Sequence, residues 1–411
     1  MATVSDTPRT MRSAGAAALA RLLRRPLASY YLVLGSAGLL LVLGLVMVFS
    51  ASSVLSLEQF GHQHYYLVRQ AAWVAVGLPI AWLVSRMPPR ILRRLALPAL
   101  IMAIVLLALT FVPGLGVTRG GNRNWLDLGG PFLLQPSEPA KLALILWGAQ
   151  VFALKGRLLQ QWKHLMIPFV PVAAAVVALI IGQRDLGTAV VIMAIVLTML
   201  WVVGVPGWLF ALALGVVGLV GVYFVTGSEN RMERVTSFLD PFEHFADGGY
   251  QAGNSIWALA NGGWWGRGLG ASQQKWGQLP EAHTDFIFAI IGEELGLLGA
   301  IVVLVLFFAL GFAGIRIAMR TRDLFVRLTA AAITGWLMIQ AVVNLGSVLA
   351  VFPVVGVPLP LVSYGGASMV VVVVAIGVLL SLAREEPGAR EALAARRQAR
   401  RDRRARREAT A

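Results

Sequence analysis

The sequence contains no cysteine and few charged residues. Without cysteine the chain can form neither disulfide bonds nor thiolate metal sites. Charged residues make up 13% of its 411 residues, roughly half the share of a soluble domain. Hydrophobic residues make up 58%, too many to be covered by polar surface in water. This composition excludes the soluble multidomain protein that the length alone would allow.

Long apolar stretches recur along the chain between residues 30 and 383. Each approaches the ~20 residues with which a helix crosses the ~30 Å hydrocarbon core of a bilayer. The sequence therefore predicts an all-α, polytopic membrane protein with about ten transmembrane helices. They are expected at residues 30–51, 66–85, 95–113, 139–154, 165–182, 186–203, 208–226, 285–313, 325–351 and 369–383.

The net charge of +15 is concentrated at the ends of the chain and in alternate loops. Ten arginines fall within the last 28 residues, and the segment before the first span is also basic. Because cytoplasmic loops carry an excess of Lys and Arg, this alternation predicts that both ends lie in the cytoplasm. Anionic lipid accounts for the charge without nucleic acid as a partner. We expect the first apolar stretch to remain as a span, uncleaved.

Three regions follow from this pattern. Residues 1–29 form a basic cytoplasmic segment, residues 30–383 the membrane domain, and residues 384–411 a basic cytoplasmic tail. Two outer loops, 113–136 and 226–284, are longer than a connection needs, and the second separates spans seven and eight. Long loops are usually functional or disordered. Their aromatic and apolar residues favour order at the membrane surface.

Asp285 lies where the long outer loop meets the eighth span. Ionisable residues near membrane depth are costly and are therefore functional candidates. Asp285 could cap the helix N-terminus, or it could act as a general base on a substrate at the membrane surface. Glu293 and Glu294 lie further along the same helix, and we expect them to tie helices together.

Two pairs of charged residues are spaced three apart. Glu138 and Lys141, at the start of the fourth span, can form an ion pair on one helix face. Alternatively, Lys141 and Arg123 supply positive charge to an anionic head group. Arg231 and Arg234 in the second outer loop could form a phosphate-binding pair.

Two further segments combine polar residues with turn-forming ones. Residues 183–188 (QRDLGT) separate spans five and six, and their charges could cap a helix or line a cavity. Residues 358–368 precede the tenth span, and their Pro and Gly content predicts irregular backbone at membrane depth. Such backbone is tolerated only where it is buried in protein or faces a cavity. These residues place an acid and several cations on the outer face without naming a substrate.

Six motifs resemble, in order, those of the SEDS family of shape, elongation, division and sporulation proteins. The resemblance covers residues 30–383, and the wording around Asp285 is most similar to the division member, with the elongation member as the near alternative. The motifs are GNRNWLDLG at 121–129, QPSEPAK at 135–141, QRDLGTA at 183–189, FLDPF at 238–242, PEAHTDFIFAIIGEELG at 280–296 and LPLVSYGGAS at 359–368.

The resemblance implies a peptidoglycan glycosyltransferase in the bacterial inner membrane, at the division septum. It implies lipid II as the substrate, and a class B penicillin-binding transpeptidase and other divisome membrane proteins as partners. Asp285 matches the family's essential aspartate and is the predicted general base. The predicted substrate-binding residues are Trp125, Arg123, Glu138, Lys141, Arg231, Arg234, Lys275, His283 and Ser363.

The implied reaction is one inverting displacement that releases undecaprenyl pyrophosphate. It needs a single base, because pyrophosphate leaves without a protein acid. We expect no cofactor, unless a divalent cation, Mg²⁺ or Mn²⁺, offsets the leaving group's charge in place of basic side chains. A lipid II flippase and a non-catalytic divisome scaffold are the rival functions.

Two departures from the family pattern bear on these assignments. Arg184 stands where the family commonly has proline, and Asn124 separates Arg123 from Trp125, which are usually adjacent. The roles of Arg184 and Arg123 are therefore less firmly implied than that of Asp285.

Overall fold

The computed structural model describes residues 25–119, 121–127, 129, 133–227, 232, 237, 240–243, 245, 249–395, 398 and 402. Eight helices in this part of the chain are long and apolar enough to cross a membrane, which confirms the polytopic, helical class. Each of the ten predicted spans coincides with a helix. These are α2 (Ala28–Phe60), α3 (Tyr65–Arg86), α4 (Pro89–Leu109), α5 (Ser137–Lys155), α7 (Phe169–Gly182), α8 (Leu186–Val203), α9 (Gly207–Thr226), α12 (Ile287–Arg320), α13 (Leu324–Val348) and α14 (Ala367–Ala383).

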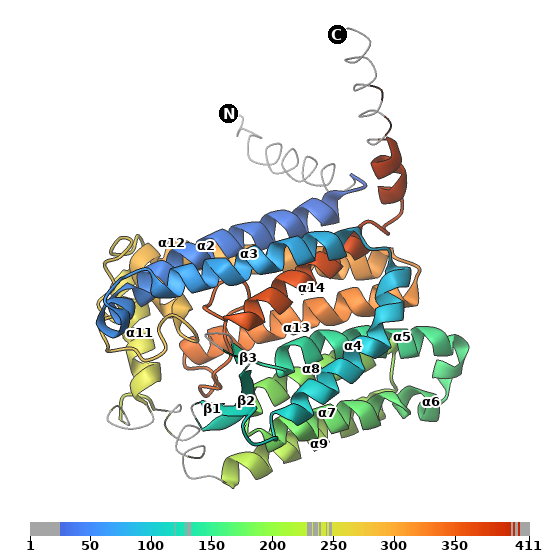
Figure 1. The fold of residues 1–411 in the computed structure, drawn as a ribbon, viewed down its shortest axis with the longest axis horizontal. Coiled ribbons are helices and arrows are strands. Elements are labelled where there is room, and N and C mark those ends of the chain that lie inside the picture. The colour runs from blue at the N-terminus through green and yellow to red at the C-terminus, as the bar shows by residue number, and fades with distance from the viewer. Residues whose placement is uncertain are drawn as a thin grey trace, which may run out of the picture.

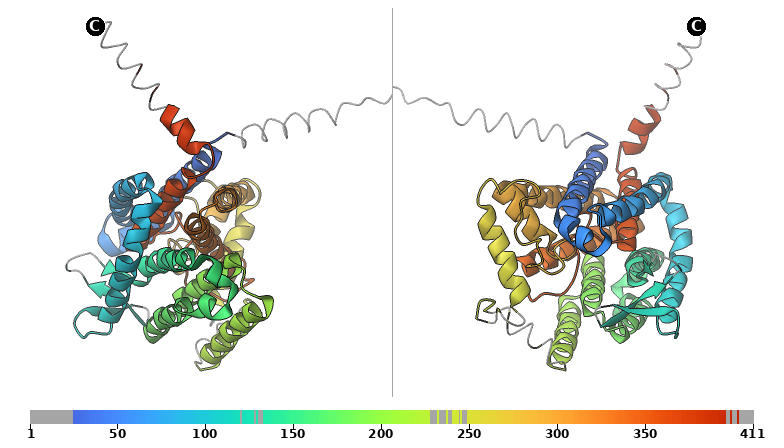
Figure 2. Two further views of the ribbon diagram at one scale, coloured as in Figure 1. Left: turned by 90° about the vertical axis from the view of Figure 1, so that its right-hand side faces the viewer. Right: turned by 60° about the vertical axis from the view of Figure 1, so that its left-hand side comes forward.

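Successive long helices run in opposite directions, so that their connections gather at two ends (Figure 1). At one end, here called the terminal end, α2 begins and α14 ends. At the other, the loop end, lie α11 (Tyr250–Gly262), a small sheet and the irregular 349–366 segment between α13 and α14. Views from two further sides show the same bundle with α13 enclosed by its neighbours (Figure 2).

The small sheet departs from the expected all-α fold. Strands β1 (Gly116–Arg119), β2 (Asn122–Asp127) and β3 (Leu133–Leu134) pair antiparallel in the order β1-β2-β3. They fall within the first long outer loop predicted from the sequence. β3 has only two residues, and β1 (GVTR) and β2 (NRNWLD) do not alternate strictly between apolar and polar residues, which is the signal that predicts strands.

The eighth predicted span, α12, is broken at Gly296. This glycine has φ +68° and ψ −167°, a conformation closed to other residues. The preceding loop replaces the lost helical partners: Leu297 N donates to Gly263 O at 2.9 Å, and Arg267 N donates to Glu293 O at 3.0 Å. The break therefore leaves these backbone groups satisfied, as membrane depth requires.

Other glycines let backbones approach closely, as small residues commonly do in membrane proteins. A Cβ at Gly44 of α2 would lie 2.6 Å from Leu361 O and 2.7 Å from Val362 O. A Cβ at Gly187 of α8 would lie 2.7 Å from Val355 O. The 349–366 segment is thus pressed between α2 and α8 as well as packed against α13.

We predict that Gly44→Val destabilises the protein by about 1–3 kcal/mol, because the added methyl groups overpack a backbone contact. Thermal unfolding of the detergent-purified protein measures the effect. Gly38→Val is the matched control on the same helix, since nothing lies within 4 Å of a Cβ at Gly38. Equal unfolding temperatures for the two variants would contradict the close packing of α2 on this segment.

Candidate active site at the loop end

The 349–366 segment is held by side-chain amides from two helices. Gln340 Nε2 of α13 donates to Pro358 O at 2.9 Å, and Asn344 Nδ2 donates to Val357 O at 2.8 Å. Gln70 Nε2 of α3 donates to Ser363 O at 3.1 Å. These bonds satisfy carbonyl groups that have no helical partner. The predicted irregular backbone is confirmed, and residues 357 and 359–363 of the segment are buried in protein.

Asp285 lies directly beside this segment. Its carbonyl oxygen accepts a 2.7 Å bond from Asn344 Nδ2, so one amide positions both the aspartate and Val357. The carboxylate faces Gly356, where a Cβ would lie 3.5 Å from Asp285 Oδ2. Helix α12 begins at Ile287 with Phe286 in the N-cap position. Asp285 therefore precedes the cap, and its side chain is partly exposed.

His283 is packed among aromatic rings next to Asp285. Its ring lies 4.6 Å from that of Tyr66 and 5.6 Å from that of Tyr364. Its carbonyl oxygen accepts a 2.9 Å bond from Tyr364 N. Burial lowers the pKa of His283, and the charge of Glu281 opposes this shift. The lowered pKa favours the neutral imidazole, and the contacts of His283 with Tyr364 join the loop before α12 to the 349–366 segment.

Ser363 is buried within the segment itself. Its hydroxyl oxygen accepts a 2.8 Å bond from Leu359 N. The side chain therefore closes a turn of the segment and lies 2% exposed.

The predicted ion pair between Glu138 and Lys141 is confirmed. Lys141 Nζ lies 2.8 Å from Glu138 Oε1, and both side chains are buried. The ammonium group also contacts Gln340 Oε1 at 3.4 Å and lies 5.0 Å from the centre of the Trp336 ring. Since Gln340 holds Pro358, the ion pair is linked to the segment beside Asp285.

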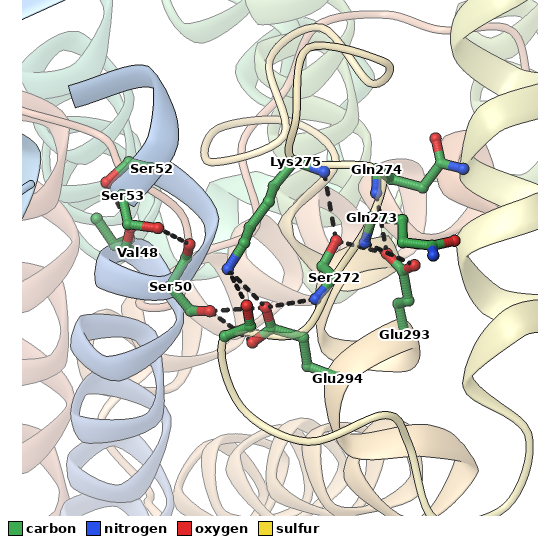
Figure 3. A network of polar contacts seen from close by, with 11 residues as sticks. Val48, Ser50, Ser52, Ser53, Ser272, Gln273, Gln274, Lys275, Glu293 and Glu294 are labelled. Carbon is green, nitrogen blue, oxygen red and sulfur yellow. Dashed lines mark hydrogen bonds and ion pairs between the residues drawn. The ribbon is translucent and has the colours of Figure 1, made fainter. Parts of the chain in front are cut away.

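Glu293 and Glu294 anchor the loop before Asp285, as Figure 3 shows. Glu294 accepts from Ser50 Oγ of α2 at 2.6 Å and pairs with Lys275 Nζ at 3.4 Å. Glu293 accepts from Ser272 Oγ and from Gln273 N at 3.0 Å. The expectation that these glutamates tie elements together is confirmed: Glu294 joins α12 to α2, and both hold the loop.

The sheet places Arg123 and Trp125 on β2, both partly buried. Between them, Asn124 Nδ2 donates to Asp185 Oδ2 at 2.7 Å. Asp185 also accepts from Thr188 N at 3.0 Å and caps α8. Of the two interpretations of residues 183–188, helix capping is therefore the one observed for Asp185.

The structure gathers only part of the predicted site. Asp285, His283, Ser363 and the ion-paired Lys141 share contacts around the 349–366 segment, whereas Lys275 lies in the separate Glu294 cluster. Arg231 and Arg234 lie outside the described residues. In the part of the chain that the structure describes, no three His, Asp or Glu side chains gather as metal ligands.

Sequence reasoning missed Gln70, Gln340 and Asn344. Gln70 lies in the apolar span 66–85, and Gln340 and Asn344 both lie in the span 325–351. The spacing of Gln340 and Asn344, four residues apart and so on one helix face, is the signal that could have identified them.

The fold and this site define a multi-pass membrane protein that holds an acidic side chain at the loop end beside a partly buried irregular segment. The chain belongs to the FtsW/RodA/SpoVE family of cell cycle proteins, whose family model matches residues 30–387.

Relatives and solved structures agree with this membership. The probable peptidoglycan glycosyltransferase FtsW of Mycobacterium tuberculosis is 42% identical over 91% of this chain and 71% of its own length. Stage V sporulation protein E of Bacillus subtilis is 36% identical over 84% of this chain and 94% of its own.

Among solved structures, a chain of a peptidoglycan synthase complex superposes with a TM-score of 0.70 and 30% identity, covering 86% of this chain and 96% of that one. RodA of Thermus thermophilus superposes with a TM-score of 0.63 and 28% identity, covering 86% and 97%.

The Glu294 cluster yields a stability prediction. Lys275→Met should destabilise the protein by about 3–5 kcal/mol, because it leaves a buried carboxylate without its cation. The double variant Lys275→Met/Glu294→Gln should recover most of that loss. Thermal unfolding of the purified variants measures both effects.

Arg267→Met serves as the control, since Arg267 is an exposed cation in the same loop. If Lys275→Met unfolded at the same temperature as Arg267→Met, the ion pair would not be what holds the loop.

Proposed function

We propose that this protein joins lipid II units into β-1,4-linked glycan strands, with Asp285 as the general base. The observation that carries this proposal is the position of Asp285. Its side chain is partly exposed at the loop end, while its backbone is fixed by Asn344.

The chain is a peptidoglycan glycosyltransferase. This statement rests on its family membership together with the curated FtsW relatives that carry this activity in their names. The fold shared with a chain of a peptidoglycan synthase complex supports the same enzyme class.

In the proposed step, the Asp285 carboxylate takes the proton from the 4-hydroxyl of the acceptor GlcNAc. That oxygen bonds to C1 of the donor MurNAc as the bond from C1 to the pyrophosphate oxygen breaks. The electron pair leaves with undecaprenyl pyrophosphate, and the anomeric configuration changes from α to β. A single carboxylate suffices, unlike the pair that inverting glycoside hydrolases need.

The leaving pyrophosphate requires positive charge nearby. Lys141 and Lys275 each face a buried carboxylate, so the charge they offer a substrate is largely offset. Arg123 on β2 has no carboxylate within 4 Å among the described residues, which favours it for this role. Arg231, Arg234 and a divalent cation, Mg²⁺ or Mn²⁺, are further proposed sources of charge.

The roles proposed for the remaining predicted contact residues rest on their positions and burial. Trp125 on β2 is proposed to contact the sugar or lipid portion of the substrate. His283, Ser363 and Glu138 are proposed to act by shaping the wall of the site, since each is buried.

The loop end is proposed to face the outside of the inner membrane. Several arginines lie at the opposite, terminal end: Arg25 precedes α2, Arg86 and Arg320 end α3 and α12, Arg93 lies near the start of α4, and Arg384 follows α14. The excess of arginine there supports a cytoplasmic location for that end, and for both chain termini.

A class B penicillin-binding transpeptidase is the proposed partner, and other divisome membrane proteins are further candidates. A structurally similar chain belongs to a peptidoglycan synthase complex in which polymerization and crosslinking are coordinated. Location at the division septum is part of the same proposal, and the matching model of cell cycle proteins supports it. An elongation role is the alternative, because RodA shares the fold.

A lipid II flippase is the rival function. It needs a polar path across the bundle, yet Lys141 and Lys275 are paired with buried glutamates at the loop end. Transport of lipid II across liposomes without any polymer would favour the flippase over the polymerase.

Asp285→Asn should lower the rate of lipid II polymerisation by about 10²–10⁴-fold, because the amide cannot accept the proton. Gel analysis of glycan formed by purified protein with its partner measures this rate. Glu281→Gln is the matched control, an exposed acid in the same loop. Full activity in both Asp285→Asn and Asp285→Ala would rule out the general-base role.

A further inference from the structure

A basic pocket lies at the terminal end, away from the proposed active site. It has a volume of about 490 Å³ and is bounded by the end of α3, the turn after α14, and the residues Arg390, Leu393, Ala394 and Gln398. Three arginines, Arg86, Arg384 and Arg390, line it together with a single acidic residue, Glu385. The lining therefore carries an excess of positive charge.

The three arginines are fixed in different ways. The Arg86 guanidinium lies 4.0 Å over the centre of the Trp82 ring. Stacking engages the plane of the guanidinium and leaves its N–H donors at the edge, where phosphate oxygens can accept them. Arg384 donates to Ser85 O at 2.8 Å, and Arg390 pairs with Glu385. The pocket lining thus contains three guanidinium groups and one carboxylate.

The chain after α14 is anchored, so the pocket is a built feature of the fold. Glu386 is 2% exposed and lies 3.5 Å from Arg320 of α12. Ala389 is fully buried, and Gly388 lies next to Pro26 at the start of the described chain. These contacts fix the chain just before Arg390, Leu393 and Ala394, which line the pocket together with the end of α3.

The pocket also has an apolar side. Met87, Pro88, Leu393 and Ala394 contribute to its lining. Trp82, one turn before Arg86, is 57% exposed on the outer surface of α3. Tryptophan at the end of a membrane-spanning helix marks the level of the lipid head groups. The pocket therefore opens where a head group and the first part of its acyl chains would lie.

We propose that this pocket binds the phosphate group of an anionic phospholipid. Basic pockets between membrane-spanning helices on the cytoplasmic side suit such head groups. Guanidinium groups bind phosphate oxygens through charge-assisted hydrogen bonds. A free phosphate compound shares the charge, but it has no apolar part to contact Met87 and Leu393. The inference is independent of the glycosyl transfer proposed for the loop end.

The test is native mass spectrometry of the full chain in detergent, titrated with phosphatidylglycerol, phosphatidylcholine or glycerol 3-phosphate. Wild type should retain phosphatidylglycerol preferentially. Arg86→Gln/Arg390→Gln should bind it at least about tenfold more weakly, because two charge-assisted contacts are lost. Arg86→Lys/Arg390→Lys should retain most of the binding.

The matched control is Arg94→Gln/Arg322→Gln, which removes the same charge from exposed positions at the same end. Equal weakening in the control would overturn the proposal, as would equal retention of phosphatidylcholine. Tighter binding of glycerol 3-phosphate than of phosphatidylglycerol would assign the pocket to a soluble phosphate instead. If the double variant did not fold, the single variant Arg86→Gln would replace it, with threefold or greater weakening expected.

Discussion

Irregular backbone inside a membrane protein must find hydrogen-bond partners within the protein, and this constraint organises the loop end. The 349–366 segment has no helical bonds of its own along most of its length. Gln70, Gln340 and Asn344 supply the missing donors from α3 and α13. Asn344 also donates to the carbonyl oxygen of Asp285. The same side chain therefore provides a hydrogen bond to the segment and positions the proposed base.

The need for hydrogen-bond partners within the protein also explains how the loop before α12 is held. Helix α12 breaks at Gly296, and the loop at 263–268 supplies the partners that the break removes. Glu293 and Glu294 then fix the following stretch of loop through Ser272 and Lys275. The loop that leads to Asp285 is therefore attached both to α12 and, through Ser50, to α2. Charges that seemed available for substrate serve partly to hold this framework.

Much of the fold could be predicted because its signals are local. Apolar runs gave the positions of the ten helices, and the three-residue spacing of Glu138 and Lys141 gave their ion pair. The break at Gly296 could not be predicted, since glycine is frequent inside continuous membrane-spanning helices. Gln70 was missed because its partner Ser363 is 293 residues away in sequence. The enzyme class came from motifs resembling a family, since the charges alone name no substrate.

The Asn344 amide of α13 keeps Asp285 in place, and the polymerisation activity of Asn344→Leu tests this role. Thr334→Val is the control, since the Thr334 hydroxyl donates within its own helix to Ala330 O at 2.7 Å. This role of Asn344 predicts that purified, folded Asn344→Leu still binds lipid II but polymerises it at least about tenfold more slowly, with Thr334→Val near wild type. Polymerisation by Asn344→Leu at the wild-type rate would contradict it.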